Sequence, residues 1–130
     1  MRYPDWQARL VAYLRSIQRL PHVYGQHDCA LFCANAVNVM TGEDYAEEFR
    51  GKYDTKKAGL LLMKEHGYSS HVALAADKLK AIPPAFATPG DLAVLKGNIM
   101  GVVQGRFIYV LTPDNLAMLD LLDATRAFKV

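Results

Sequence analysis

The sequence has little of what marks a membrane, secreted or nucleic-acid-binding protein. No apolar run approaches the ~20 residues that a membrane-spanning helix requires. The first residues, MRYPDWQARL, lack the apolar core of a signal peptide. The formal net charge is only +2, so the composition provides no strongly basic surface for nucleic acid. We expect a chain that is made in the cytoplasm and has no membrane span.

Cysteine is also scarce. The chain has two cysteines, Cys29 and Cys33, which fall four residues apart on one predicted helix. Side chains at this spacing leave from successive turns, where a relaxed disulfide is not expected. No second cysteine pair and no histidine at ligand spacing accompany them, which argues against a zinc site. We therefore expect two free thiols, no metal and no other cofactor.

The residues that are present predict one domain over residues 1–130. With 52% hydrophobic residues, a chain of 130 residues can bury a core without disulfides or metals. Helical periodicity and capping residues dominate the first part of the sequence. The predicted helices are one that opens near Pro4 and ends before Pro21, a buried central helix over residues 29–40, one over residues 55–67, and a short one over residues 70–79.

The later part of the sequence changes to short β-rich runs. Runs at residues 92–95, 99–103 and 106–111 are separated by KGN and QG turns and predict an antiparallel meander. Residues 116–122 are expected to add a helical turn. Residues 127–130 are expected to form a last strand whose edge could pair with a partner chain. The fold class is therefore α+β, with N-terminal helices and a buried central helix packed on a C-terminal antiparallel sheet.

The stretch VYGQHDCALFCANAV contains the candidate site. Asp28 is a good helix N-cap, which places Cys29 at a helix N-terminus, where N–H groups and the helix dipole stabilise a thiolate. Cys29 is therefore a candidate nucleophile. The alternative is a small apolar residue at the start of a buried helix, because free cysteine is among the most buried residue types. Cys33, one turn later, is interpreted as core.

Histidine is the usual partner of a catalytic thiol. His27 lies two residues before Cys29 and is the first candidate base; the alternative is a loop histidine bonded to the backbone. His22 is the next candidate. His66 is interpreted as a residue that complements a helix C-terminus, and His71 as a surface residue near a helix start.

The charged residues support weaker hypotheses. Arg50, Lys52, Lys56 and Lys57 form a basic segment that could meet an acidic partner or a phosphate, with a solvated loop as the alternative. Asp91 follows a Pro-Gly turn, where we expect it to accept hydrogen bonds from backbone N–H groups.

Several motifs together resemble a known superfamily. In order, they are PHVYG, DCALF at the start of a buried helix, and PGDLAVL at the start of an antiparallel sheet. This order resembles the NlpC-type cell-wall peptidases, which have the bacterial papain-like fold. The motifs HDCALF, FRGKYDT and GDL most resemble a small family of unknown function common in tailed phages and prophages.

The resemblance implies roles for residues of the candidate site. Cys29 matches the superfamily nucleophile and Asp28 its helix cap. Tyr24 matches an aromatic residue of the preceding loop, and His22 stands where an aromatic residue helps to shape the substrate site. The catalytic histidine of active members opens the strand after GDL. Here Ile99 or Met100 holds that place.

The resemblance therefore leaves three functions open. The first is a structural or binding component of a phage tail tip or baseplate, or an assembly factor for one, with a degenerate peptidase fold. The second is a cysteine amidase or endopeptidase that uses Cys29 on peptidoglycan. The third is a regulator that binds a host protein. The partners expected are phage tail or baseplate proteins, with peptidoglycan as substrate in the second case, and the location of a structural component is the virion tail.

Overall fold

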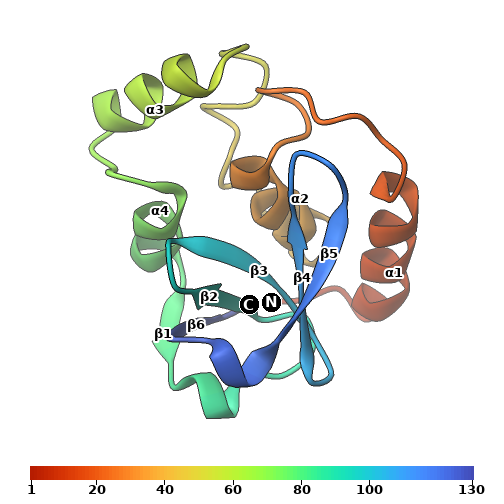
Figure 1. Cartoon of the computed structure of the whole chain (residues 1–130). Coiled ribbons are helices and arrows are strands. Elements are labelled where there is room, and N and C mark those ends of the chain that lie inside the picture. Colours follow the sequence, from red (N-terminus) through yellow and green to blue (C-terminus); the bar gives the residue numbers. More distant parts are fainter.

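The structure is a computed structural model that describes residues 1–130, and it consists of four α-helices followed by a sheet of six antiparallel strands (Figure 1). The helices are α1 (Trp6–Ile17), α2 (Cys29–Thr41), α3 (Lys56–Glu65) and α4 (His71–Lys78). The strands are β1 (Lys80–Ile82), β2 (Leu92–Leu95), β3 (Ile99–Gln104), β4 (Phe107–Leu111), β5 (Leu116–Asp120) and β6 (Arg126–Lys129). The predicted α+β class and the order of helices before sheet are confirmed.

Helix α2 is the central buried helix, as predicted. It begins after Asp28, whose side chain accepts a hydrogen bond from the Leu31 N–H at 2.8 Å. It ends at Gly42, which adopts the left-handed conformation (φ 82°) that glycine tolerates best. Its apolar side chains Phe32, Cys33, Ala36, Val37 and Met40 are all buried.

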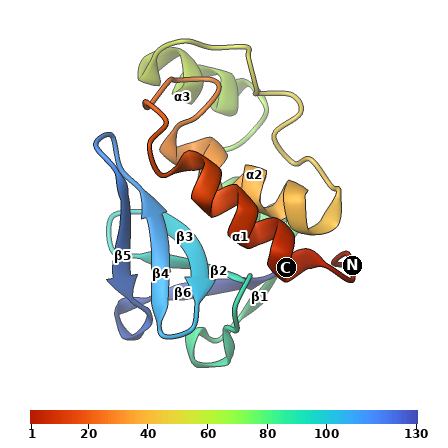
Figure 2. The same cartoon turned by 90° about the vertical axis from the view of Figure 1, so that its right-hand side faces the viewer.

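The other helices surround α2 on different sides. Figure 2 shows α1 and α2 together on one side of the sheet, and α1 buries Leu10, Leu14 and Ile17 against this core. Helices α3 and α4 begin at side-chain caps from Thr55 and Ser70. In both views α3 lies farthest from the sheet (Figures 1 and 2), so much of its surface is left without a neighbour. No helix is long and apolar enough to cross a membrane.

The strands are ordered β1-β6-β2-β3-β4-β5 in the sheet. The meander from β2 to β4 matches the prediction, and β5 extends it. Two expectations were wrong. Residues 116–120 form strand β5 rather than a helical turn, because they pair along the full length of β4, and the only helical turn here is the 3₁₀ helix Leu121–Asp123. Strand β6 has no free edge for a partner, because it lies between β1 and β2 and pairs with both.

The sheet is buried on both faces. Leu92, Val94, Met100 and Val102 point to the core shared with α1 and α2. Alternate residues form a smaller cluster on the opposite face, where the connections around the short 3₁₀ helices Pro84–Phe86 and Leu121–Asp123 cover them. Of the β3 side chains, only those on the face that packs against α2 can therefore approach this helix.

The two chain ends lie side by side and are joined through Asp91 (Figure 2). This fully buried carboxylate accepts hydrogen bonds from the Arg2 guanidinium at 2.8 Å and from the Val130 N–H at 3.0 Å. It also accepts from the Thr88 N–H at 3.0 Å, which confirms the predicted capping of the turn. Asp91 thus connects the first residues, the last strand and the start of β2.

Candidate functional site

The loop before α2 is a tight turn closed by its own backbone. Val23 and His27 exchange two backbone hydrogen bonds of 2.8 Å, which form a one-pair bridge. Gly25, inside this turn, has φ +86°, and a Cβ there would lie 2.0 Å from the carbonyl oxygen of Tyr53. Only glycine fits both constraints. The turn brings His22, Tyr24 and His27 to the N-terminal end of α2.

Asp28 organises the start of the site. It is buried, and besides capping α2 it accepts hydrogen bonds from the Gly25 N–H at 2.9 Å and from the Tyr53 hydroxyl at 2.5 Å. Burial and the hydrogen bond to Asp28 together raise the pKa of Tyr53. The side chain of Tyr53 therefore stays protonated and donates to the carboxylate.

The segment FRGKYDT braces this arrangement. The Gly51 N–H donates to the Gly25 carbonyl at 2.7 Å, next to the Tyr53 contact. Arg50 is held by the side chains of Asp44 and Asn35. The Arg50 side chain is therefore occupied by contacts within the molecule. Of the predicted basic segment, only Lys52, Lys56 and Lys57 are free for other contacts.

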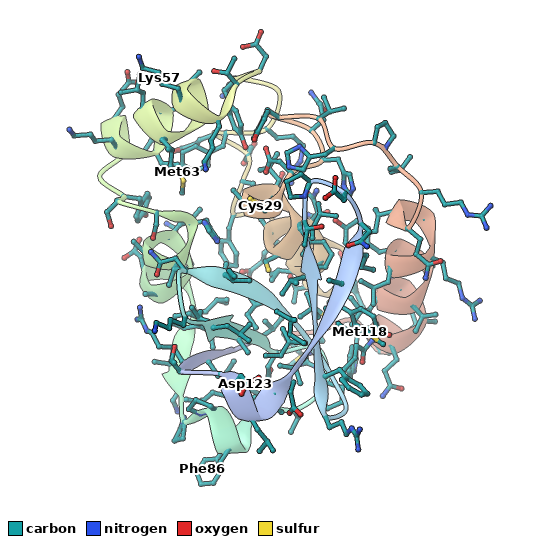
Figure 3. The ribbon with its side chains drawn as sticks, viewed as in Figure 1. Cys29, Lys57, Met63, Phe86, Met118 and Asp123 are labelled. Carbon is teal, nitrogen blue, oxygen red and sulfur yellow. The ribbon has the colours of Figure 1, made fainter.

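Cys29 is the first residue of α2, and its side chain reaches the surface, while Cys33 is fully buried. Figure 3 shows Cys29 at the open end of α2, between α3 and the strands. Both cysteines are free thiols, as predicted. No side-chain hydrogen bond reaches the Cys29 sulfur.

The surroundings of Cys29 do not favour a thiolate. Partial burial and then the negative charge of Asp28 raise the pKa of Cys29. The N–H groups of Cys29 and Ala30, together with the Lys56 ammonium, act in the opposite direction but are outweighed. Burial raises the pKa of Cys33 as well. Both thiols are therefore protonated at neutral pH.

His27, the first candidate base, is buried, and its Nε2 atom has no hydrogen-bond partner. Burial, with a smaller effect of His22, lowers the pKa of His27. A neutral imidazole is what a base requires, but no hydrogen bond joins it to Cys29. His22 packs edge-on against Tyr24, with ring centroids 4.7 Å apart. None of His22, Tyr24 and His27 is therefore hydrogen-bonded to the Cys29 thiol.

The strand position where the resemblance expects a histidine is occupied by apolar residues. Met100 is buried and packs in the core that contains Cys33. Ile99 is 45% exposed and therefore leaves the core at the end of the strand. By the alternation of a strand, Met100 is the residue that faces α2. The side chain that β3 presents to α2 at this position is therefore a thioether.

One histidine is nearer to the site than predicted. His71, the first residue of α4, is only partly exposed, not a surface residue. Burial lowers the pKa of His71, while the Asp28 charge and the Asn98 backbone act to raise it. His71 therefore lies between the start of α2 and the turn before β3. Its place directly after the Ser70 cap was visible in the sequence, but the packing of α4 was not.

Comparison with known proteins gives a family and nothing finer. The profile of a family described as a domain of unknown function, DUF6950, matches residues 1–130. No curated protein and no solved structure matches the chain. The chain therefore belongs to the DUF6950 family over its whole length.

Proposed function

We propose that this protein is a structural or binding component of a phage tail tip or baseplate, built on a degenerate NlpC-type papain-like fold. The motifs PHVYG, HDCALF, FRGKYDT and PGDL support the relationship. Helix α2, with Cys29 first and its body packed on an antiparallel sheet, is consistent with it. A fold of this kind can persist after the activity of its relatives is lost.

The observation that carries the proposal is Met100. A buried methionine faces α2 at the place where the base of an active relative would stand. A thioether cannot accept the thiol proton at neutral pH, so Cys29 has no base on the strand. The raised pKa of Cys29 is consistent with this loss.

A second candidate function is a cysteine amidase or endopeptidase acting on peptidoglycan. It is favoured by the exposed side chain of Cys29 at a helix N-terminus, where the N–H groups of Cys29 and Ala30 act to lower the pKa of the thiol. The Cys29 thiolate would attack an amide carbonyl, the amine would leave with a proton, and water would hydrolyse the thioester. His27 or His71 would have to take the thiol proton.

Two measurements on the wild type and Cys29→Ala test the proposal. We expect both forms to be detected in purified phage particles by immunoblot, because incorporation depends on protein contacts and not on the thiol. Neither form is expected to release peptides from purified peptidoglycan, as followed by mass spectrometry. Absence from particles, or release that requires Cys29, would contradict the proposal.

A further inference from the structure

The outer side of α3 contains a hollow that shares only Lys56 with the candidate site. Its volume is about 810 Å³, and its lining includes Lys56, Lys57, Lys64, Leu60 and Leu61. Figure 3 shows Lys57 on the outer side of α3 and Met63 on the opposite side, toward the rest of the molecule. The hollow is thus formed by the face of α3 that does not contribute to the core.

The three lysines of this hollow have no acidic partners. None of them takes part in the ion pairs of the structure, and no acidic residue lines the hollow. Lys56 and Lys57 also stand in the first turn of α3, where no acidic residue balances them. Cations at a helix N-terminus are unfavourable because they meet the positive end of the dipole. The fold therefore leaves all three lysine charges without an acidic partner.

Two leucines lie among these charges. Leu60 and Leu61 are 51% and 53% exposed, and they are neighbours on α3. Single exposed leucines are ordinary, but here two of them line one hollow together with three lysines. The leucines suit an apolar side chain, and the lysines suit carboxylates beside it.

We propose that this hollow binds an acidic protein segment that carries an apolar anchor residue. A free phosphate would leave the leucines unused. A membrane surface would not fill the hollow that these residues line, and the vesicle measurement below tests it separately. This hollow would be the surface through which the proposed binding component contacts another protein. The inference rests on the proposed function only for the choice of a protein as the partner.

The test uses a synthetic peptide of glutamates with a central pair of leucines, and a control peptide in which serines replace the leucines. Titration of the ¹⁵N-labelled chain with each peptide is followed by NMR. We expect the amide shifts to cluster at residues 56–69 and the leucine peptide to bind about tenfold more tightly, because two buried leucines exceed the ~1.4 kcal/mol that a tenfold change represents.

Two variants with the same charge change locate the site. Lys57→Glu with Lys64→Glu is expected to weaken binding about tenfold or more, because it places like charges opposite each other. Lys52→Glu with Lys96→Glu alters exposed lysines outside the hollow and is expected to change binding less than about threefold. Circular dichroism checks that both variants fold.

Several outcomes would overturn the proposal: no binding of either peptide, equal binding of the two peptides, equal loss in the two charge variants, or shifts that lie away from α3. Binding of anionic vesicles that is lost only in the Lys57 and Lys64 variant, without peptide binding, would assign the hollow to a membrane and overturn it too. Cys29→Ala should bind the peptide as the wild type does. Loss of peptide binding would overturn the inference about the hollow, whereas absence from phage particles would overturn the proposed function.

Discussion

At the scale of single residues, Asp28 connects the candidate site to the rest of the molecule. One carboxylate caps α2, closes the turn at Gly25 and accepts the Tyr53 hydroxyl. The Asp28 carboxylate is buried, so without these three donors its oxygen atoms would lack hydrogen-bond partners. The same charge raises the pKa of Cys29 next to it. Asp28 therefore orders the site and opposes a thiolate there.

Replacement of Tyr53 by phenylalanine tests this bracing. Tyr53→Phe removes a hydrogen bond to a buried carboxylate, so we expect the free energy of unfolding to fall by about 1.5–3 kcal/mol. Urea denaturation followed by circular dichroism measures the change. Tyr68→Phe is the matched control, since its hydroxyl donates to the exposed Asp77, and we expect a clearly smaller loss from it. Equal losses in the two variants would contradict the account of Asp28.

The buried histidines predict a dependence of stability on pH. Burial lowers the pKa of both His27 and His71 in the folded chain. Below about 6.5, the ordinary histidine pKa, the unfolded chain binds protons that the folded chain does not. The free energy of unfolding should therefore fall as the pH falls below that value, and be unaffected by these groups above it.

The measurement is urea denaturation between about pH 7.5 and about pH 5, the range over which histidine titrates. We expect a shallower pH dependence in His27→Gln and His71→Gln than in the wild type. His66→Gln removes an imidazole whose Nε2 lies 3.1 Å from a Glu48 oxygen, and it shows whether a histidine outside the buried pair gives the same change. An unchanged slope in both buried-site variants would mean that neither imidazole is held neutral by the fold.

At the scale of elements, the helices could be predicted from the sequence because their signals are local. Asp28, Thr55 and Ser70 each cap a helix as side chains of their type do. Strands 92–95 and 99–104 also carried clear β patterns between glycine turns. These elements were predicted to within a residue or two, because cap and pattern agree at each of them.

Other elements depend on partners distant in the sequence. The segment LAMLD of β5 has residues that favour helices, yet pairing with β4 makes it a strand. Strand β1 has three residues and exists through its pairing with β6. The positions of His71 and Met100 around α2 also follow from tertiary packing. For this reason the place of Cys29 at the start of α2 could be predicted, but not the side chains that pack around that helix.

Gly25 gives a prediction for the loop element. Gly25→Ala would place a Cβ 2.0 Å from the Tyr53 carbonyl oxygen, in addition to the cost of a positive φ. Gly67→Ala is the matched control, because Gly67 has φ +88° but nothing within 4 Å of a Cβ. We expect Gly67→Ala to cost about 1–2 kcal/mol and Gly25→Ala clearly more, as measured by urea denaturation. Equal costs would show that the loop does not press on Tyr53.

At the scale of the whole molecule, Asp91 joins the chain ends. It is fully buried, with Arg2 and the Val130 N–H as partners, and its removal would leave the Arg2 charge mostly enclosed. We expect Asp91→Ala to lower the free energy of unfolding by about 3–5 kcal/mol. Asp5→Ala breaks the exposed pair with Arg9 and should change the free energy of unfolding far less. Faster hydrogen exchange at the Val130 amide should accompany the first change, and its absence would contradict the role of Asp91.

The central claim about the whole protein is that it retains the fold around Cys29 without the chemistry. The most direct measurement is the rate of Cys29 alkylation as a function of pH, followed by mass spectrometry in the wild type, His27→Gln and His71→Gln. We expect an apparent pKa above the ordinary cysteine value, unchanged in both variants, with Cys33 unmodified in the folded chain because it is buried. An apparent pKa below the ordinary value that rises when either histidine is replaced would contradict the claim and identify a working cysteine–histidine pair.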